Sequence, residues 1–314
     1  MNSKGRNFVK IIEEICLEEK ISLESFSSGW VLKLCKDNIN KYIFGYKFEL
    51  NPSAVDAICC DKSAASDVMK SFNIPNIEHE FFVSPQNQKY VGESGTWGRL
   101  MELLNKNKKL VCKPNDGAGG NNVYLVCSQK DLELATYNIF KTAKAMAVSP
   151  YYEIENEYRT IVLNGDIKLI YSKKRPYVIG NGIDNFGKLL LLHSARYGGH
   201  DVDNRNINKE MLSKIIARDE IVYLNWKHNL GQGAKAEILY DEAIIDKVTS
   251  VVLKITGNMD VKFASIDIVE TEDEYKVLEI NSGVMMEHLS KQSNELYSVA
   301  KEIYREAILS MFNS

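Results

Sequence analysis

The pattern of apolar and polar positions predicts helices and strands along most of the chain. Near the start, apolar residues recur every three or four positions with charged residues between them, which predicts an amphipathic helix. Further helices are predicted over residues 63–72, 131–144 and 241–256 and near residue 300. Short strands are predicted over residues 30–34, 42–48, 80–83, 110–113 and 123–127, and residues 54–60 form another apolar run.

The clearest hairpin signal lies between residues 158 and 171. Alternation over residues 158–163 leads through Asn164-Gly165 into a second apolar stretch, and Asn-Gly suits the tight turn between two antiparallel strands. Residues 172–236 have less regular pattern and several glycines, which indicates long functional loops. Mixed strands and helices with several hairpins predict α+β lobes rather than one doubly wound sheet.

Two apolar runs on either side of residue 272 each carry one acid. Asp267 and Glu279 are both flanked by apolar residues, and Asn281 follows two positions after Glu279. Alternation along a strand sends these three side chains to the face opposite their apolar neighbours. If the runs pair as a hairpin, oxygen ligands converge in a way that suits Mg2+. On this segment alone, a solvated hairpin with outward polar residues explains the pattern equally well.

A glycine-rich turn follows a lysine at the end of a predicted strand. Lys113 precedes Gly117, Gly119 and Gly120, and another apolar strand comes next. Glycines let backbone amides approach an anion closely, and a nearby ammonium neutralises it. The turn is not a Walker loop, because no Gly-Lys-Ser/Thr is present and no helix follows. Taken alone, it also fits a tight structural hairpin.

Length and charge exclude several other classes of protein. At 314 residues the chain exceeds the size at which one core stops growing, so two or three lobes are expected. A net charge of −3 gives no electrostatic reason to expect nucleic acid or an anionic membrane as partner. No apolar stretch approaches the roughly 20 residues that span a bilayer, and the first residues do not fit a signal peptide. We expect a cytoplasmic protein whose six cysteines are free thiols.

Taken in order, these segments resemble the ATP-grasp enzymes over about residues 55 to 290. Lys113-Pro114 with its glycine loop looks like the hairpin that covers the nucleotide phosphates in that family. Asp61-Lys62 is similar to the family's entry segment, whose lysine contacts the phosphates. The resemblance also implies three further sites. The hinge, whose backbone binds adenine in that family, falls on Tyr151, Tyr152 and Glu153, and the acid that holds the ribose falls on Glu157. The magnesium ligands fall on Asp267, Glu279 and Asn281.

The resemblance implies an α+β fold that holds ATP between two α+β lobes, with one or two Mg2+, or Mn2+ in their place. We expect a short N-terminal α/β lobe over residues 1–60 and a central lobe with the glycine loop over residues 61–149. A C-terminal lobe over residues 150–314 would carry the hinge, the metal site and a lid over residues 183–210. The region before Asp61 is shorter than in many relatives, so part of a substrate platform is expected to be missing or supplied by a partner.

Two further segments narrow the resemblance to one subgroup of the ATP-grasp enzymes. Residues 174–182 resemble the Arg-x-Pro-x-x-Val-x-Gly-Asp-Gly stretch of cyanophycin synthetases and fused bacterial glutathione synthetases, although Asn181 replaces the aspartate. Residues 227–233 resemble the Arg-x-Asn segment of those enzymes and of ribosomal-protein glutamate ligases. Lys227 replaces that arginine and cannot make a bidentate contact with phosphate. After Asn281 the family usually has Pro-Gly, whereas this chain has Ser282-Gly283, so it departs from the family in the substrate-side loop.

The resemblance implies an ATP-dependent ligase that joins a small-molecule carboxylate to an amine through an acyl phosphate. At least one of the two substrates is expected to be an amino acid or a short peptide. The sequence leaves the oligomeric state open, although relatives are commonly dimers or tetramers. Two alternatives are a nucleotide-binding regulator without chemistry and a kinase that only phosphorylates its substrate. The residues with implied catalytic roles are Arg159, Arg175, Lys227 and Asn229.

Overall fold

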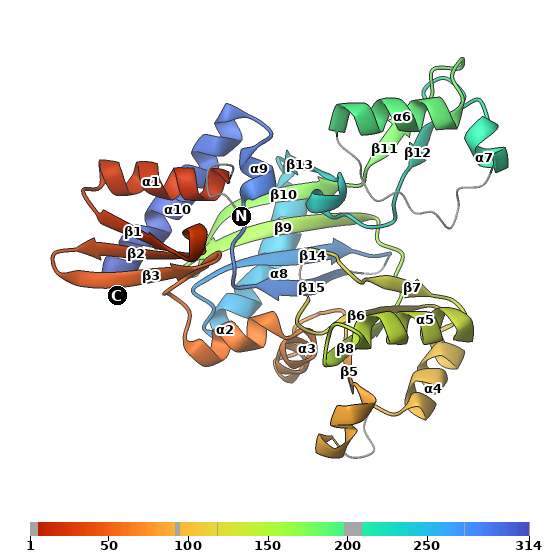
Figure 1. The fold of residues 1–314 in the computed structure, drawn as a ribbon, viewed down its shortest axis with the longest axis horizontal. Helices are drawn as coiled ribbons and strands as arrows, with labels where there is room; N and C mark the ends of the chain where they lie inside the picture. Colours follow the sequence, from red (N-terminus) through yellow and green to blue (C-terminus); the bar gives the residue numbers. More distant parts are fainter. Residues whose placement is uncertain (1–5, 92–94, 118, 198–208, 273, 314) are drawn as a thin grey trace. The chain divides into compact units, whose positions relative to one another are not determined.

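The computed structural model describes residues 6–91, 95–117, 119–197, 209–272 and 274–313. The chain divides into two compact units (Figure 1). The first unit comprises Met1–Gly117, Asn122–Ile170 and Leu239–Ser314, and the second comprises Ala118–Asn121 and Tyr171–Ile238. The three lobes expected from the sequence are a functional division and stay a prediction.

An antiparallel sheet from the N-terminal part of the chain packs in the first unit with helix α1 and with two helices, α9 and α10, from the C-terminal end. The sheet has the order β1-β2-β3-β4, and helix α1 contacts helix α10 from the C-terminal end of the chain. Phe48 stacks on Tyr304 with ring centroids 5.6 Å apart, which joins this sheet to α10. The bounds are α1 (Asn7–Glu18), β1 (Ser22–Phe26), β2 (Val31–Lys36), β3 (Ile39–Phe44), β4 (Lys47–Phe48), α9 (Glu287–Ser290) and α10 (Asn294–Asn313).

A second antiparallel sheet of the first unit has the order β5-β8-β6-β7. One face packs on helices α4 and α5 through a core that includes Phe82, Leu104 and Cys112. Lys113 directly opposes Ala147 of the neighbouring strand and alternates with Cys112, so it points away from this core. The bounds are β5 (Glu80–Val83), α4 (Trp97–Asn107), β6 (Leu110–Pro114), β7 (Tyr124–Val126), α5 (Gln129–Phe140) and β8 (Ala145–Pro150).

The third sheet of the first unit contains the predicted hairpins, in the order β10-β9-β14-β15. Its apolar face, which includes Ile266 and Ile280, shares one core with Met69 and Val252 of two covering helices. The apolar run over residues 54–60 is helical and packs beside this core. The bounds are α2 (Ser53–Cys60), α3 (Lys62–Ser71), β9 (Asn156–Leu163), β10 (Asp166–Lys174), α8 (Glu242–Met259), β14 (Phe263–Glu270) and β15 (Tyr275–Asn281).

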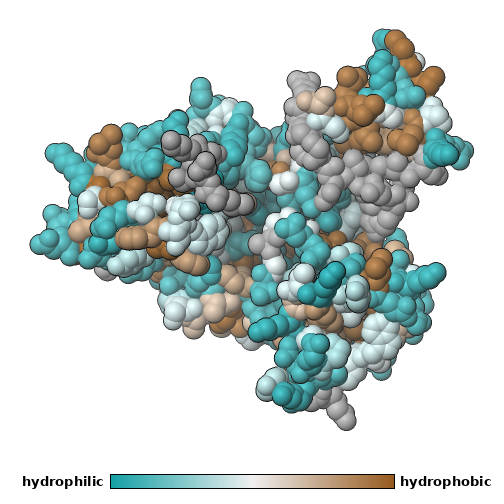
Figure 2. Space-filling view, in the orientation of Figure 1, coloured by the Kyte–Doolittle hydropathy of each residue, from teal (hydrophilic) through white to brown (hydrophobic). Residues whose placement is uncertain are grey.

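The second unit has a core of its own. The C-terminal half of β10 pairs with β13, and β11 pairs with β12. Val178, Phe186, Leu189, Ile216 and Leu224 form the buried cluster. Exposed apolar side chains gather over this unit (Figure 2), among them Ile179, Ile183, Leu191, Leu192, Ile215, Ile221 and Tyr223. The bounds are β11 (Tyr177–Ile179), α6 (Phe186–Tyr197), α7 (Lys209–Ser213), β12 (Ile221–Tyr223) and β13 (Lys235–Ile238).

The observed elements confirm the predicted α+β class and correct one expectation. Residues 172–236 are not only long loops, because helices α6 and α7 and strands β11 and β12 form in the described part of this range. Residues 198–208 of the predicted lid lie outside the described residues. None of the helices within the described ranges is long and apolar enough to span a membrane.

Candidate active site

A row of charged side chains crosses three neighbouring strands of the first unit. Arg159 of β9 directly opposes Asp267 of β14, which in turn opposes Glu279 of β15. Ser265 and Asn281 oppose each other in the adjacent row. Directly opposite residues share a face of an antiparallel sheet, so all five lie on the face away from the covering helices. The structure therefore brings the three predicted metal ligands together.

Asp267 is held tightly by Arg159. Both carboxylate oxygens accept hydrogen bonds from the guanidinium, Oδ1 from Nε and Oδ2 from Nη2, each at 2.7 Å. Asp267 is only 1% exposed, so this bidentate pair is a buried one. Each carboxylate oxygen has a second lone pair, so the contact with Arg159 does not prevent Asp267 from binding a metal.

The donor set fits a magnesium ion that is shared with phosphates. Asn281 Nδ2 donates to Glu279 Oε1 at 3.2 Å, which directs the amide oxygen Oδ1 elsewhere as a donor to a metal. Two carboxylates and an amide oxygen are hard ligands, and Mg2+ commonly takes one or two carboxylates together with substrate phosphates. Within the described residues, no three His, Cys, Asp or Glu side chains form a metal site by themselves.

Lys113 brings a buried ammonium to the same region. The side chain is 6% exposed, and burial lowers its pKa to about 8. The negative charge of Glu279 raises this pKa most strongly, and those of Glu157 and Asp267 also raise it. The positive charge of Lys62 lowers it further. These electrostatic interactions link Lys113 to the predicted metal ligands, although it comes from a different sheet.

Lys62 connects the entry segment with the start of the glycine loop. Asp61 caps helix α3 by accepting a hydrogen bond from the Ala64 backbone amide at 2.8 Å, which fixes where the helix begins. Lys62 Nζ then donates to the carbonyl oxygens of Asn115 and Gly117. Two segments that lie about fifty residues apart, both predicted to bind phosphate, are therefore in direct contact.

The predicted hinge leads from β8 directly into β9. The Tyr151 amide donates to the Lys109 carbonyl at 3.1 Å, and the Tyr151 hydroxyl donates to Glu153 at 3.2 Å. Tyr152 lies beneath the ammonium of Lys276, 5.1 Å from its ring centroid. Glu157 follows at the start of β9, is 6% exposed, and shares the face of Arg159 because the two alternate along the strand.

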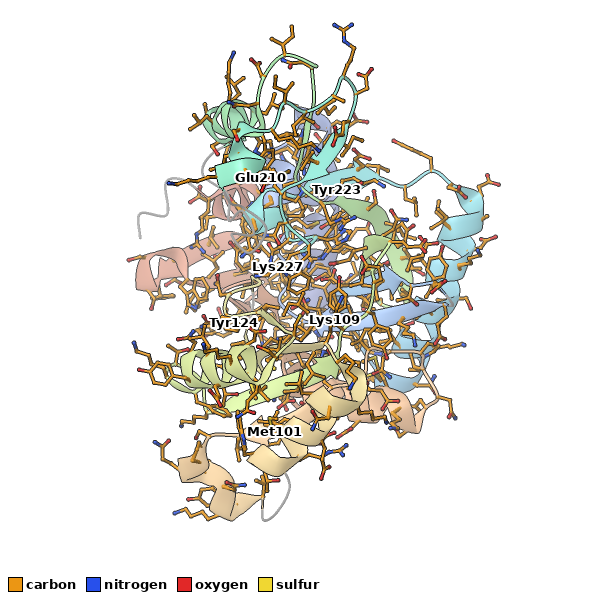
Figure 3. The ribbon with its side chains drawn as sticks, turned by 90° about the vertical axis from the view of Figure 1, so that its right-hand side faces the viewer. Met101, Lys109, Tyr124, Glu210, Tyr223 and Lys227 are labelled. Carbon is orange, nitrogen blue, oxygen red and sulfur yellow. The ribbon has the colours of Figure 1, made fainter. Side chains whose placement is uncertain are left out.

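The second unit brings the rest of the glycine loop together with the Arg-x-Asn-like segment. Lys227 Nζ, on the residue labelled in Figure 3, donates to the Gly120 carbonyl at 3.4 Å. A Cβ on Gly120 would lie 2.4 Å from Asn229 Nδ2, so any other residue there would displace the Asn229 amide, and Gly119 has no such close neighbour. Arg175 has a different contact: its guanidinium lies 4.0 Å from the ring centroid of Tyr223.

The sequence analysis missed the surroundings of the loop after Asn281. The Val284 amide donates to the Tyr46 carbonyl at 3.0 Å, and Lys47 forms a bridge with Gly283. Ser282 is 1% exposed and contacts the Cys60 thiol at 3.3 Å. The departure from Pro-Gly marked this loop, but no local pattern indicates contacts between residues more than two hundred positions apart.

Comparisons with known proteins bear on the family and the fold. Residues 214–306 match the family described as RimK-like ATP-grasp domain. The chain is 36% identical over 212 residues to the tetrahydromethanopterin:alpha-L-glutamate ligase of Methanocaldococcus jannaschii, covering 67% of this chain and 56% of that protein. It is 29% identical over 199 residues to a cyanophycin synthetase of Geminocystis herdmanii, covering 57% of this chain and 22% of that protein.

The curated relatives are therefore matched over 22% and 56% of their own lengths. Among solved structures, a bifunctional glutathione synthetase from Pasteurella multocida has a TM-score of 0.57 at 15% identity, covering 96% of this chain and 44% of that chain. This likeness extends over nearly the whole chain and shows the fold. The protein thus has the ATP-grasp fold, and its residues 214–306 are similar to the RimK-like ATP-grasp domain, which confirms the resemblance predicted from its motifs.

Proposed function

We propose that this protein is an ATP-dependent ligase that joins a carboxylate to an amine and releases ADP and phosphate. The observation that supports this most strongly is the row formed by Arg159, Asp267 and Glu279, together with the buried ammonium of Lys113 that interacts with both acids. A buried cation beside a pair of hard oxygen ligands suits the transfer of a phosphoryl group from a metal-bound nucleotide.

The reaction takes place in two steps. A carboxylate oxygen of the first substrate attacks the γ-phosphorus of ATP, the bond to the β-phosphate oxygen breaks, and ADP leaves. The amine nitrogen of the second substrate then attacks the carbonyl carbon of the acyl phosphate. The carbon–oxygen bond breaks, phosphate leaves with that electron pair, and the nitrogen loses a proton to form the amide.

Each part of the site has a role in these steps. Lys62 and Lys113 bind the nucleotide phosphates, and the backbone of Gly117, Gly119 and Gly120 covers them. The hinge backbone at Tyr151, Tyr152 and Glu153 binds the adenine, and Glu157 binds the ribose. Asp267, Glu279 and Asn281 would hold one or two Mg2+, which neutralise phosphate charge when bound.

Cations and an amide from several elements would stabilise the acyl phosphate. Arg159 keeps Asp267 oriented through its bidentate contact. Within the second unit, Lys227 and Asn229 lie against Gly120. The resemblance implies that these two residues act on the transferred phosphoryl group. Arg175 is the weakest of the catalytic candidates, because its guanidinium stacks on Tyr223.

The names of the relatives suggest the class of substrate. One matched protein is named as a ligase for alpha-L-glutamate and another as a cyanophycin synthetase. We infer that an α-amino acid, or a short peptide that ends in one, is a substrate of this protein. A cytoplasmic location and self-association stay predictions.

A phosphate-release assay over pairs of amino acids and common carboxylates tests the proposal. We expect release only when both a carboxylate and an amine accompany ATP and Mg2+, and loss of this release in Asp267→Asn and Glu279→Gln. Hydroxylamine should convert the intermediate into a hydroxamate, because only an acyl phosphate reacts in this way. ATP binding without phosphate release across the panel would favour a regulator, and a stable phosphorylated product without hydroxamate would favour a kinase.

A further inference from the structure

Glu270 is the last residue of β14, at the end of the sheet where the chain enters β9 from the predicted hinge. It directly opposes Asn156, the first residue of β9, and Tyr275, the first residue of β15. Directly opposite residues share a face of the sheet, so these three side chains lie together. Glu270 is half-buried there and lies outside the residues assigned to the site so far.

The carboxylate of Glu270 accepts three side-chain hydrogen bonds. Oε2 accepts from Asn156 Nδ2 at 2.9 Å and from the Tyr158 hydroxyl at 2.8 Å, and Oε1 accepts from the Tyr275 hydroxyl at 2.5 Å. The backbone carbonyl of Glu270 also accepts from the Glu155 amide at 3.0 Å. Burial raises the pKa of this carboxyl, but the three hydrogen bonds and a nearby lysine outweigh burial and lower the pKa below its usual value. At pH 7 the group is therefore an anion that only accepts hydrogen bonds.

Two of these hydrogen bonds hold the neighbours of Glu157, the acid predicted to bind the ribose. Asn156 precedes Glu157 and Tyr158 follows it, and both of these side chains donate to the same oxygen of Glu270. Alternation along β9 sends the Glu157 side chain to the opposite face of the sheet, in the row of Val269, which directly opposes it. Glu270 therefore fixes the backbone on both sides of Glu157 from the face opposite to its carboxylate.

These contacts lie where β9 is most easily opened. The strand begins at Asn156, and residues 151–155 before it belong to no helix or strand. The ends of elements open locally more readily than their interiors, so the first residues of β9 need support to keep one conformation. Hydrogen bonds to an ionised group are the stronger ones, and Glu270 makes two of them to the first and third residues of this strand. Glu157 is the residue between them.

We propose that Glu270 is a positioning residue for ATP binding: by holding Asn156 and Tyr158, it keeps the Glu157 carboxylate directed at the ribose hydroxyls of the nucleotide. This inference rests on the proposed function, because it takes Glu157 as the acid that binds the ribose. A group that is already held in its bound conformation loses little freedom when the ligand arrives, so its contact contributes more to affinity. Glu270 itself does not touch the nucleotide, since its side chain lies on the other face of the sheet.

Calorimetric titrations of two Glu270 variants with ATP and 2′,3′-dideoxy-ATP, in the presence of Mg2+, test this role. The second nucleotide differs from ATP only in lacking both ribose hydroxyls. In Glu270→Ala we expect the dissociation constant for ATP to rise about tenfold, which is the worth of one hydrogen bond to a charged group. The dissociation constant for the dideoxy nucleotide should not change. Glu270→Gln should bind ATP within about threefold of wild type, because its amide oxygen can still accept from Asn156 and Tyr158 while its amide nitrogen donates to the Tyr275 hydroxyl.

A Glu157→Ala background separates positioning of Glu157 from a structural role. Glu270→Ala should cause no further loss of ATP affinity in that background, because the contact it supports is already gone, and this comparison also decides the case if Glu270→Ala lowers the melting temperature. Equal weakening of both nucleotides by Glu270→Ala, or unchanged binding of both, overturns this inference alone. Wild-type protein that binds no ATP would overturn the proposed function as well, and wild-type protein that binds both nucleotides equally would overturn the ribose role of Glu157 on which the inference rests.

Discussion

At the scale of single residues, Asp267 depends on Arg159 for its place in the fold. The carboxylate is almost fully buried, and both of its oxygens accept hydrogen bonds from one guanidinium. A buried charge that loses its partner keeps the penalty of leaving water without the attraction that offsets it. The same pair is therefore both a candidate part of the active site and a condition for folding.

Arg159→Met should lower the free energy of unfolding by about 3–5 kcal/mol, because it removes the guanidinium that binds both oxygens of the buried Asp267 carboxylate. Adding Asp267→Asn to this variant should recover a large part of the loss, since the amide is neutral. Urea denaturation of the two single variants and the double variant measures both effects. Losses that simply add would show that the two side chains do not interact in this way.

Lys113 predicts a pH dependence for ATP binding. Burial lowers its pKa to about 8, and only the ammonium form attracts phosphate, so ATP affinity should fall as the pH rises through about 8. Stability should change in the opposite direction: between that value and the usual pKa of 10.5, the unfolded chain binds more protons than the folded one, so stability rises with pH. Titrations from pH 6 to 10 should show both trends in wild type and neither in Lys113→Met.

The site could be predicted only where its geometry is local. Alternation along a strand fixed the common face of Glu279 and Asn281, and the acidic turn predicted the pairing that adds Asp267. The partner of Asp267 could not be predicted, because the pairing of β9 with β14 joins residues more than a hundred positions apart.

At the scale of elements, the glycine loop depends on close approach as well as on backbone conformation. Gly119 and Gly120 both have a φ of +71°, which disfavours any side chain. Only Gly120 also lies against Asn229, whose amide would collide with a Cβ. The two positions are therefore a matched pair that separates strain of the backbone from contact with the neighbouring segment.

Gly120→Ala should reduce the proposed ligase activity much more than Gly119→Ala, because only the first must displace Asn229. Backbone strain alone is worth about 1 kcal/mol at either position, or roughly fivefold in an equilibrium constant. We expect the additional loss in Gly120→Ala to appear in kcat/KM for ATP. Equal losses of activity in the two variants would show that the activity does not depend on the position of the Asn229 side chain.

The predicted helices and strands agree best with the structure where an apolar stripe is long and regular. Residues 241–256 were predicted as a helix and lie within α8 (Glu242–Met259), whose apolar side packs on the central core. Residues 54–60 gave only an apolar run, because a short run does not distinguish a strand from a helix. Helix α6 was missed, since the small core of its unit buries Phe186 and Leu189 but leaves Leu191 exposed.

At the scale of the whole molecule, the two units differ in the size of the hydrophobic core inside each of them. Among its described residues, the second unit has a small cluster of five buried side chains, and its β11-β12 ribbon has two strands. The first unit has larger cores on two of its sheets. An isolated two-stranded ribbon is marginally stable, so local opening should begin there.

Hydrogen–deuterium exchange should therefore reveal two levels of protection. We expect amides of β11 (Tyr177–Ile179) and β12 (Ile221–Tyr223) to exchange well before those of β9 and β14, which lie in the middle of their sheet. Added ATP with Mg2+ should slow exchange in β14 and β15 if they carry the nucleotide site. Uniform exchange in both units would contradict the difference in their cores.

The contact between the loop after Asn281 and the N-terminal sheet limits how this protein can be re-engineered. Val284 and Gly283 hold Tyr46 and Lys47, so a predicted metal ligand is only two or three residues from an anchor in the first fifty. A chimera that exchanges residues 1–60 to alter substrate choice would also release one end of β15. Such a transplant has to carry the turn at Tyr46 and Lys47 with it, because the backbone of this turn holds the loop that follows the predicted metal ligand.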